Sequence, residues 1–428
     1  MIKILVVPSG TEIAQEVVRS LNYLKGVEVF GANSVKCFSE IDRDKNFIGI
    51  PYVNETGFID NVKEIVQNHG ITHIFPAHDS ASLLLSEHRN DLVAKVISSS
   101  FETNQICRSK KQTYQMLADT VKVPRVFTLD DSDSFSFPMF AKPDIGQGSV
   151  GIKKINSPSD LINVTDADVL CEYLPGDEYT VDCVTDSEGK LIYAHARKRL
   201  TMRNGIATET ELVSENKSFY EFAEKVNSKL VLEGAWFIQV KEDVNGELCL
   251  LEAATRVAGS MFTNRLNGVN FAELSLLITD KTPVKALPNN LDIKLYRSLS
   301  YQFETNLDFE VVYTDFDDCL IFDDKVNYEL VAFLYKVINH GVKVVLITRH
   351  AGDLNRTLSD LRLTELFDQV IHITDKRSKS DFITEKKSIF IDDAFSERFD
   401  VRSIHSIPCF SVDMVPGLLS MNIRKVIK

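Results

Sequence analysis

The chain has 428 residues, of which 44% are hydrophobic and 25% are charged, and its formal net charge is −13. This size predicts about two to four domains with well-filled cores, and the acidic balance gives no basic surface for nucleic acid or an anionic membrane. No apolar run approaches the roughly 18 residues of a membrane span, and the seven cysteines include no C-x-x-C pair, which favours reduced thiols. We therefore expect a cytoplasmic protein with neither nucleic acid nor membrane as a partner.

Short apolar runs alternate with helical patterns over the first hundred residues. The predicted strands are 2–7, 27–30, 73–76 and 95–97, and the predicted helices are 12–24 and 59–69. This alternation predicts a small parallel sheet wound with helices. His78 and Asp79 follow a strand end, where ligands often bind, but we favour a structural role for both.

A glycine-rich loop follows a strand in the next part of the chain. Gly146, Gly148 and Gly151 spell G-x-G-x-x-G, which in a dinucleotide site requires a helix to begin at the loop. The residues that follow, 152–155, favour a strand instead. We therefore predict a flap whose backbone N–H groups close over phosphates, while Lys142 on the incoming strand neutralises them. The alternative is an ordinary hairpin with a surface lysine.

An Asn-Gly pair at 245–246 lies between two alternating runs, which is a strong signal for a two-residue hairpin turn. Such a turn pairs Val244 with Glu247 and sets Gln239 opposite Glu252 on one face. Two oxygen-bearing side chains in this position suit Mg²⁺ beside a triphosphate. The alternative is a Gln–Glu pair on the surface.

Arginine side chains lie close to these strands in the sequence. Arg256 comes just after the hairpin, where its fork of donors suits a transferred phosphate. A basic run follows the strand near Tyr193 and consists of Arg197, Lys198, Arg199 and Arg203. This run is interpreted either as facing an acidic substrate, chiefly through Arg199, or as a solvated face.

Together these motifs resemble the ATP-grasp family over roughly residues 1–305, and most closely its carbamoyl-phosphate-synthase-like and amino-acid-ligase-like branches. The resemblance implies a Rossmann-like preATP-grasp domain over 1–104 and an ATP-grasp α+β domain over 105–306. It implies that ATP is held by Lys110 (or Lys111), Lys142, the flap residues Gly146, Gly148, Ser149 and Gly151, the adenine hinge Glu172, Tyr173 and Leu174, and the ribose-binding Glu178. It also implies Gln239 and Glu252 as the Mg²⁺ ligands.

One position departs from the family pattern. The usual ending E-h-N-P-R appears here as Glu252-Ala-Ala-Thr-Arg256, so Ala254 stands where a metal-binding asparagine is usual. The implied reaction is the activation of a carboxylate by ATP to an acyl phosphate, which an amine then displaces. Arg256 would be catalytic, and Arg199 and Arg256 would bind substrate. A regulatory protein that binds nucleotide without turnover is the alternative.

The rest of the chain forms a second alternating block of strands and helices. Asp315 and Asp317 follow its first apolar run, Thr348 ends the second, and Asp392 and Asp393 follow the third. Parallel strand ends share one edge of a sheet, and carboxylates gathered there require a cation such as Mg²⁺. Asp315 is placed to attack phosphorus, with Asp317 as general acid and base.

This block resembles the haloacid-dehalogenase-like (HAD-like) phosphohydrolase family over about residues 309–428. The resemblance implies a parallel-sheet domain without a cap and a second Mg²⁺. The residues it implies are the nucleophile Asp315, the acid/base Asp317, the hydroxyl of Thr348, Lys379 (or Lys376), and the metal ligands Asp315, Asp317 and Asp392. Cys319 stands where threonine is common, so either it merely packs or the catalyst has decayed, and we favour an active phosphatase.

The two resemblances together predict an ATP- and Mg²⁺-dependent carboxylate–amine ligase fused to a phosphatase. The expected partners are small-molecule carboxylates and amines and a phosphorylated metabolite, and a homodimer is left open. A phosphatase whose ATP-grasp half only binds ATP is a further alternative.

Overall fold

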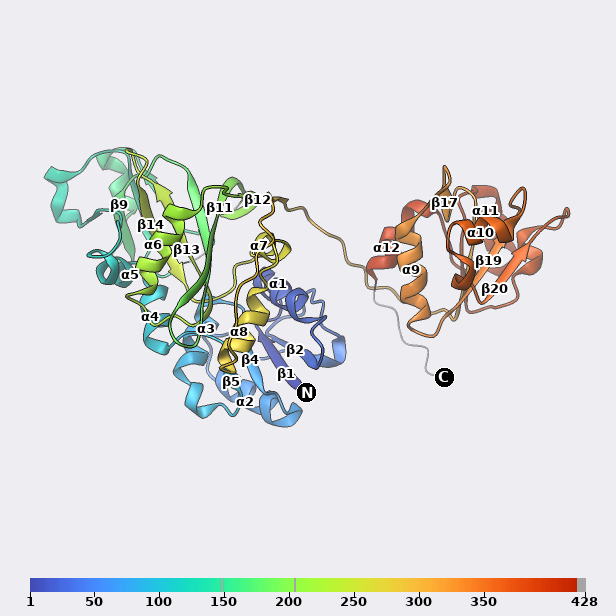
Figure 1. The fold of residues 1–428 in the computed structure, drawn as a ribbon, viewed down its shortest axis with the longest axis horizontal. Coiled ribbons are helices and arrows are strands. Elements are labelled where there is room, and N and C mark those ends of the chain that lie inside the picture. The colour runs from blue at the N-terminus through green and yellow to red at the C-terminus, as the bar shows by residue number, and fades with distance from the viewer. Residues whose placement is uncertain (147, 149, 204, 422–428) are drawn as a thin grey trace. The chain divides into compact units, whose positions relative to one another are not determined.

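The computed structural model describes residues 1–146, 148, 150–203 and 205–421. The chain divides into two compact units, Met1–Ser298 and Leu299–Lys428, and both mix helices with strands (Figure 1). This boundary lies before the end of the predicted ATP-grasp domain at residue 306. None of the described helices is both long and apolar enough to cross a membrane.

The first unit begins with a five-stranded sheet in the order β3-β2-β1-β4-β5, in which all neighbours are parallel. The strands are β1 Ile2–Val7, β2 Val27–Asn33, β3 Asn46–Ile48, β4 His73–Pro76 and β5 Lys95–Val96, and the helices among them are α1 Glu12–Leu21, α2 Phe58–His69 and α3 Asp79–Glu87. The central strand β1 is buried from Ile4 onward, as its Ile/Val-rich sequence requires. The predicted parallel sheet is confirmed.

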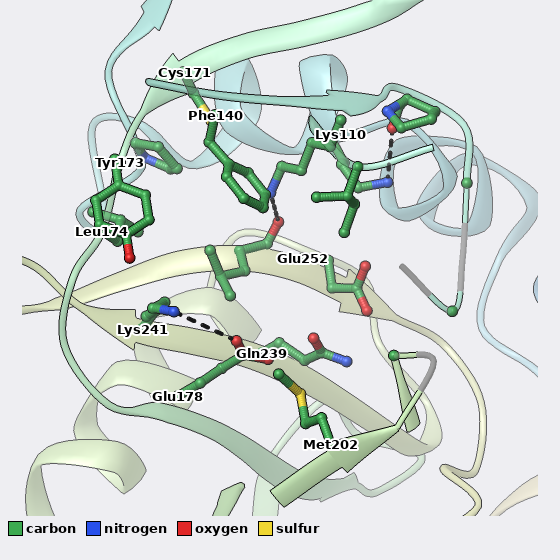
Figure 2. Close-up of a pocket in the computed structure, with 18 of the residues that line it drawn as sticks. Lys110, Phe140, Cys171, Tyr173, Leu174, Glu178, Met202, Gln239, Lys241 and Glu252 are labelled. Atoms are coloured by element: carbon green, nitrogen blue, oxygen red, sulfur yellow. Dashed lines mark hydrogen bonds and ion pairs between the residues drawn. The ribbon is translucent and has the colours of Figure 1, made fainter. Parts of the chain in front are cut away.

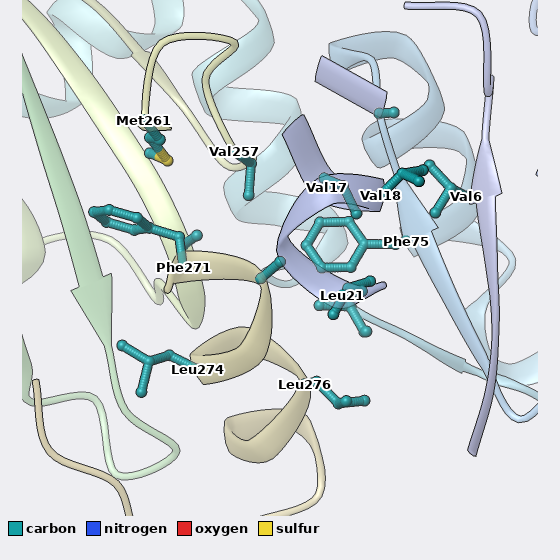
Figure 3. Packing of buried hydrophobic residues seen from close by; sticks show 14 of the residues in the cluster. Val6, Val17, Val18, Leu21, Phe75, Val257, Met261, Phe271, Leu274 and Leu276 are labelled. Atoms are coloured by element: carbon teal, nitrogen blue, oxygen red, sulfur yellow. The ribbon is translucent and has the colours of Figure 1, made fainter. Parts of the chain in front are cut away.

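One hydrophobic cluster joins this sheet to the rest of the first unit. The hydroxyl of Thr11 accepts a hydrogen bond from the Ala14 N–H and starts α1. The apolar side of α1, including Val17 and Leu21, packs beside α8 (Phe271–Thr279), as Figure 3 shows. The parallel sheet therefore packs on a helix that comes shortly after the predicted metal-binding hairpin in the chain.

Two antiparallel sheets make up the remainder of the first unit. The smaller sheet has the order β6-β9-β7-β8 and the larger has the order β14-β13-β10-β11-β12-β15. The strands are β6 Val126–Phe127, β7 Met139–Pro143, β8 Lys153–Ile155, β9 Asp168–Glu172, β10 Glu178–Thr185, β11 Leu191–Arg203, β12 Ile206–Leu212, β13 Gly234–Glu242, β14 Leu248–Ala254 and β15 Lys294–Tyr296. The helices are α4 Phe101–Arg108, α5 Lys110–Leu117, α6 Lys217–Asn227 and α7 Phe262–Leu266.

The glycine loop joins β7 to β8, which pair antiparallel with Met139 opposite Ile155. No helix begins at the described residues of the loop, so the predicted order of strand, loop and strand is confirmed. Ser149 lies outside the described residues.

The β13–β14 hairpin has the predicted pairing of Gln239 with Glu252, but it reaches this pairing differently. The predicted two-residue turn is wrong, because β13 ends at Glu242, β14 begins at Leu248, and Val244 does not pair with Glu247. The side chain of Asp243 accepts hydrogen bonds from the Asn245 and Glu247 N–H groups and holds a longer loop. A bulge between Gln239 and Val240 then restores the predicted register.

The alternating pattern of residues 295–304 predicts a last strand before the second unit, and this prediction is mostly wrong. Only Lys294–Tyr296 pairs, with Glu209–Glu211 of β12, and so forms the edge strand β15. The residues that follow have no strand neighbour among the described residues, so their alternating pattern does not give a ladder.

The second unit contains a five-stranded parallel sheet in the order β20-β19-β16-β21-β22. Its strands are β16 Val311–Thr314, β19 Lys343–Thr348, β20 Gln369–His372, β21 Ser388–Ile391 and β22 Cys409–Phe410, with a hairpin of β17 Ile321–Phe322 and β18 Lys325–Val326. The helices are α9 Tyr328–Ile338, α10 Leu354–Asp360, α11 Phe395–His405 and α12 Val415–Ser420. Helices α9 and α12 pack on one face of the sheet and α11 packs on the other. The alternating block is confirmed as a parallel α/β unit.

Candidate active sites

A cavity of about 450 Å³ in the first unit is lined by both antiparallel sheets and by the glycine loop (Figure 2). Most of the residues predicted to hold ATP line it: Lys110, Lys142, Gly146, Gly148, Glu172, Tyr173, Leu174, Glu178, Gln239 and Glu252. Arg199 lines it too, whereas Gly151 does not. Residues up to 142 positions apart in the chain therefore share one cavity, from Lys110 to Glu252.

Two buried lysines enter this cavity from different elements. The Nζ of Lys142 on β7 donates to the Leu251 carbonyl at 3.1 Å and lies over the Tyr114 ring. The Nζ of Lys110, at the start of α5, donates to the carbonyls of Pro143 and Asp144 at 3.1 and 3.2 Å. Burial lowers the pKa of both amines, and nearby Glu252 opposes that shift. A phosphate group in the cavity would favour their charged forms.

The side chain of Asp144, which the sequence interpretation missed, fixes Lys110. It accepts hydrogen bonds from the Ser109 hydroxyl at 2.9 Å and from the Lys111 N–H at 2.8 Å, and so anchors the first turn of α5. The sequence shows a carboxylate in the loop after Lys142, but it contains no pattern that would predict its contact with α5.

The end of the cavity near the predicted adenine hinge has aromatic and apolar walls. Phe140, Tyr173 and Leu174 line this end, whereas Met202 lines the cavity on the side of Gln239 (Figure 2). Such walls suit a planar base whose edge meets main-chain groups. Phe140 and Met202 were not predicted, although Phe140 lies two residues before Lys142 and so shares its face of β7.

Glu178, predicted to bind ribose, lies between two cations. Its carboxylate is 3.3 Å from Nη1 of Arg199 and 3.8 Å from Nζ of Lys241, and Lys241 pairs with it across β10 and β13. Lys241 also lines the cavity, two residues along β13 from Gln239. Because side chains two residues apart on a strand share one face, the predicted position of Gln239 could have identified Lys241 as well.

Gln239 and Glu252 satisfy a simple test for a metal pair. They lie opposite each other in register, both line the cavity, and no hydrogen bond joins either side chain to another described residue. Free amide and carboxylate oxygens placed side by side suit a hard cation. Ala254 contributes no ligand atom, and its methyl group packs in the hydrophobic cluster of Figure 3.

A second cavity of about 290 Å³ adjoins the first, because Gly146, Gln239 and Glu252 line both. Arg256 lines this second cavity, where its Nε and Nη2 donate to the two carboxylate oxygens of Asp79 at 2.8 Å. Asp79 begins α3, so this ion pair joins the parallel sheet domain to the end of the hairpin.

The second unit gathers three carboxylates at the carboxyl edge of its sheet. Single oxygen atoms of Asp315, Asp392 and Asp393 lie within 4.8 Å of one another, which fits a cation site. The Nζ of Lys379 lies 2.8 Å from Asp315 and 2.6 Å from Asp392. Burial, and then Asp392, raises the pKa of Asp315 to about 6 against the opposing effect of Lys379.

The other predicted residues of this unit lie at or after the ends of β16 and β19, and Asp317 is not among the three grouped carboxylates. Thr348 ends β19 in a buried position and accepts a hydrogen bond from the His350 N–H at 3.1 Å. The carboxylate of Asp317 is held by Nδ1 of His350 at 2.8 Å, a contact that the sequence interpretation missed. Cys319 is fully buried, with its thiol directed to the Ile391 carbonyl at 3.8 Å, which agrees with a packing role.

Comparisons with known proteins bear on the first unit. Residues 165–297 match a family model described as ATP-grasp in the biosynthetic pathway with Ter operon. The biotin carboxylase domain of Hydrogenobacter thermophilus 2-oxoglutarate carboxylase, in complex with MgADP, ADP and bicarbonate, has 14% identity and a TM-score of 0.57, covering 68% of this chain and 72% of that one. Bacillus licheniformis L-amino acid ligase has 16% identity and a TM-score of 0.56, covering 67% and 75%.

Staphylococcus aureus N5-carboxyaminoimidazole synthetase, complexed with ADP, has 14% identity and a TM-score of 0.53, covering 67% of this chain and 79% of that one. A comparison with curated proteins finds no match. At these identities the structural likeness concerns the fold, and the family model adds an independent match over the strands that carry the hinge and the hairpin. The first unit therefore has the fold of these ligases and carboxylases, and residues 165–297 match an ATP-grasp family model.

Proposed function

We propose that the first unit is an ATP- and Mg²⁺-dependent ligase that activates a carboxylate and joins it to an amine. The observation that carries this proposal is that Lys142, the glycine loop and the Gln239–Glu252 pair line one cavity. The similar structures support it, because they include an amino acid ligase and a carboxylase domain holding MgADP and bicarbonate.

In this reaction a carboxylate oxygen of the substrate attacks the γ-phosphorus of ATP, and the bond to the leaving oxygen of ADP breaks. The amine then attacks the carbonyl carbon of the acyl phosphate, loses a proton, and phosphate departs. Lys110 and Lys142 hold phosphate oxygens and offset their charge. Gln239 and Glu252 would hold Mg²⁺, which when bound supplies further positive charge to the phosphates.

For the second unit we propose a phosphomonoester hydrolase of the HAD-like kind. The grouping of Asp315, Lys379 and Asp392 supports this activity. An oxygen of Asp315 would attack phosphorus and displace the alcohol, and water would then hydrolyse the aspartyl phosphate, with Asp317 moving the proton in both steps. Asp315 and Asp392, with Asp317 or the adjacent Asp393, would hold Mg²⁺, which offsets the charge of the phosphate.

The test is a panel of carboxylic acids, amines and phosphate esters in which ADP and phosphate are assayed separately. Lys142→Ala is expected to reduce acid-dependent ADP release by about 10²–10³-fold, because a charge contact to the transferred phosphate is lost. Lys190→Ala, at an exposed position in the turn before β11, is the matched control and should retain activity. Full ADP release by Lys142→Ala would exclude this site.

A further inference from the structure

Five arginines line the smaller cavity of the first unit, and four of them already have a carboxylate partner. The pairs are Arg197 with Asp182 at 2.8 Å, Arg199 with Glu178 at 3.3 Å, Arg256 with Asp79 at 2.8 Å and Arg297 with Glu12 at 2.7 Å. The positive charges of these four guanidinium groups are therefore neutralised by the protein without any ligand.

Arg108, the last residue of α4, is the exception among the five. Its Nη1 donates to the Gly146 carbonyl at 3.2 Å and its Nη2 donates to the Ser80 hydroxyl at 3.3 Å. Both partners are neutral, both contacts are long, and no described carboxylate lies within ion-pair distance of this guanidinium. Since Arg108 is half-buried, its charge is only partly hydrated and attracts an anion.

The cavity that Arg108 lines indicates which kind of anion it would bind. Arg108 lines the smaller cavity but not the larger one, where the nucleotide residues lie. It contacts Gly146, which lines both cavities, and so it reaches the border at which the two reactants would meet. The volume of about 290 Å³ suits a small acid of about ten non-hydrogen atoms, if each takes roughly the 30 Å³ of a water molecule.

We propose that Arg108 binds the reacting carboxylate of the acid substrate and is a specificity-determining residue of the ligase. This inference rests on the proposed function of the first unit. It also separates the roles of two arginines: Arg256 braces the cavity through Asp79, and Arg108 supplies the free positive charge. The substrate class is a small carboxylic acid, such as an amino acid.

The test compares Arg108→Gln and Arg108→Lys with wild type, using the acid that gives ADP release in the panel. For Arg108→Gln we expect the KM for the acid to rise at least about tenfold, while the KM for ATP and the affinity for MgADP stay within about twofold. Arg108→Lys should recover part of the loss. Arg19→Gln on α1, an exposed arginine paired with Glu40, is the matched control.

A binding measurement removes the dependence on turnover. With saturating MgADP, acetate is titrated into wild type and Arg108→Gln by calorimetry, and loss of acetate binding in the variant supports the proposal. Absence of acetate binding by wild type, or equal binding by both proteins, would overturn it. An unchanged acid KM with weaker binding of a non-hydrolysable ATP analogue would assign Arg108 to the γ-phosphate instead. Arg108-dependent acetate binding without ADP release in any panel would contradict the ligase proposal and leave the carboxylate site standing.

Discussion

The two units balance the charges of their candidate sites in opposite ways. Around the smaller cavity of the first unit, most arginines are matched by a carboxylate, as in the Arg256–Asp79 pair. In the second unit the amine of Lys379 contacts Asp315 and Asp392, and the carboxylate of Asp393 lies beside those two. Most guanidinium charges around the smaller cavity are therefore paired before any ligand binds, whereas the three-carboxylate group of the second unit carries excess negative charge.

The pKa shifts of two aspartates show the consequence. Burial acts to raise the pKa of Asp79, but Arg256, with help from Arg108, holds it below its usual value. At Asp315 burial and the neighbouring Asp392 outweigh Lys379, and the pKa rises to about 6. The first site is therefore preorganised by its own ion pairs, while the second requires a cation to keep its carboxylates ionised.

The largest expected effect separates the two sites directly. Asp315→Asn removes the nucleophile and should reduce phosphate release from the responsive ester by about 10³-fold or more, with ADP release by the first unit unchanged. Asp323→Asn, an exposed aspartate in the β17–β18 turn, is the matched control. Parallel ADP and phosphate assays provide the measurement. A simultaneous loss of ADP release would mean that the two sites work in sequence.

A smaller effect tests whether the arginines around the smaller cavity are neutralised by carboxylates of the protein itself. Asp79→Asn leaves Arg256 without its counter-charge and should destabilise this unit by about 1.5–3 kcal/mol, measured by calorimetry at neutral pH. Because the pKa of Asp79 is lowered in the folded state, its stabilisation is present above the usual value of 3.8 and is lost as the pH falls through the folded pKa. The variant should therefore lose less stability than wild type on acidification.

The matched control for this experiment is Asp119→Asn, at an exposed position after α5. If Asp79→Asn melted like the control at every pH, the Arg256–Asp79 pair would contribute nothing to preorganisation. The comparison between the two units would then rest on the second unit alone.

The sequence predicted the residues of the larger cavity better than it predicted how they are held. A strand lysine followed within a few residues by a glycine-rich loop, and two oxygen-bearing residues in a hairpin, are local patterns that a single sequence shows. The Arg256–Asp79 pair joins residues 177 positions apart, and no local pattern contains it. Asp144 and Arg108 were missed for the same reason, because their partners lie on other elements.

In the hairpin, the predicted pairing of Gln239 with Glu252 is correct although the predicted turn is wrong. The Asn-Gly rule gave the wrong turn, since the side chain of Asp243 stabilises a longer loop. The bulge after Gln239 offsets that change, so Gln239 still faces Glu252. Turn rules consider two residues and cannot include a side chain outside the turn that accepts two backbone hydrogen bonds, or a bulge several residues away.

The smallest effect concerns the missing metal ligand of the first unit. Ala254→Asn places an amide oxygen one alternation along β14 from Glu252, at the position where an asparagine is usual in the family that this chain resembles. If Gln239 and Glu252 hold Mg²⁺, one added ligand of about 1 kcal/mol should lower the Mg²⁺ concentration for half-maximal ADP release by about fivefold. Ala254→Ser, which adds a shorter side chain, is the control for the polar substitution in the hydrophobic cluster. An unchanged Mg²⁺ requirement in a folded Ala254→Asn protein would contradict the assignment of the metal to this pair, since a vacant ligand position beside a bound cation should respond to an oxygen placed there.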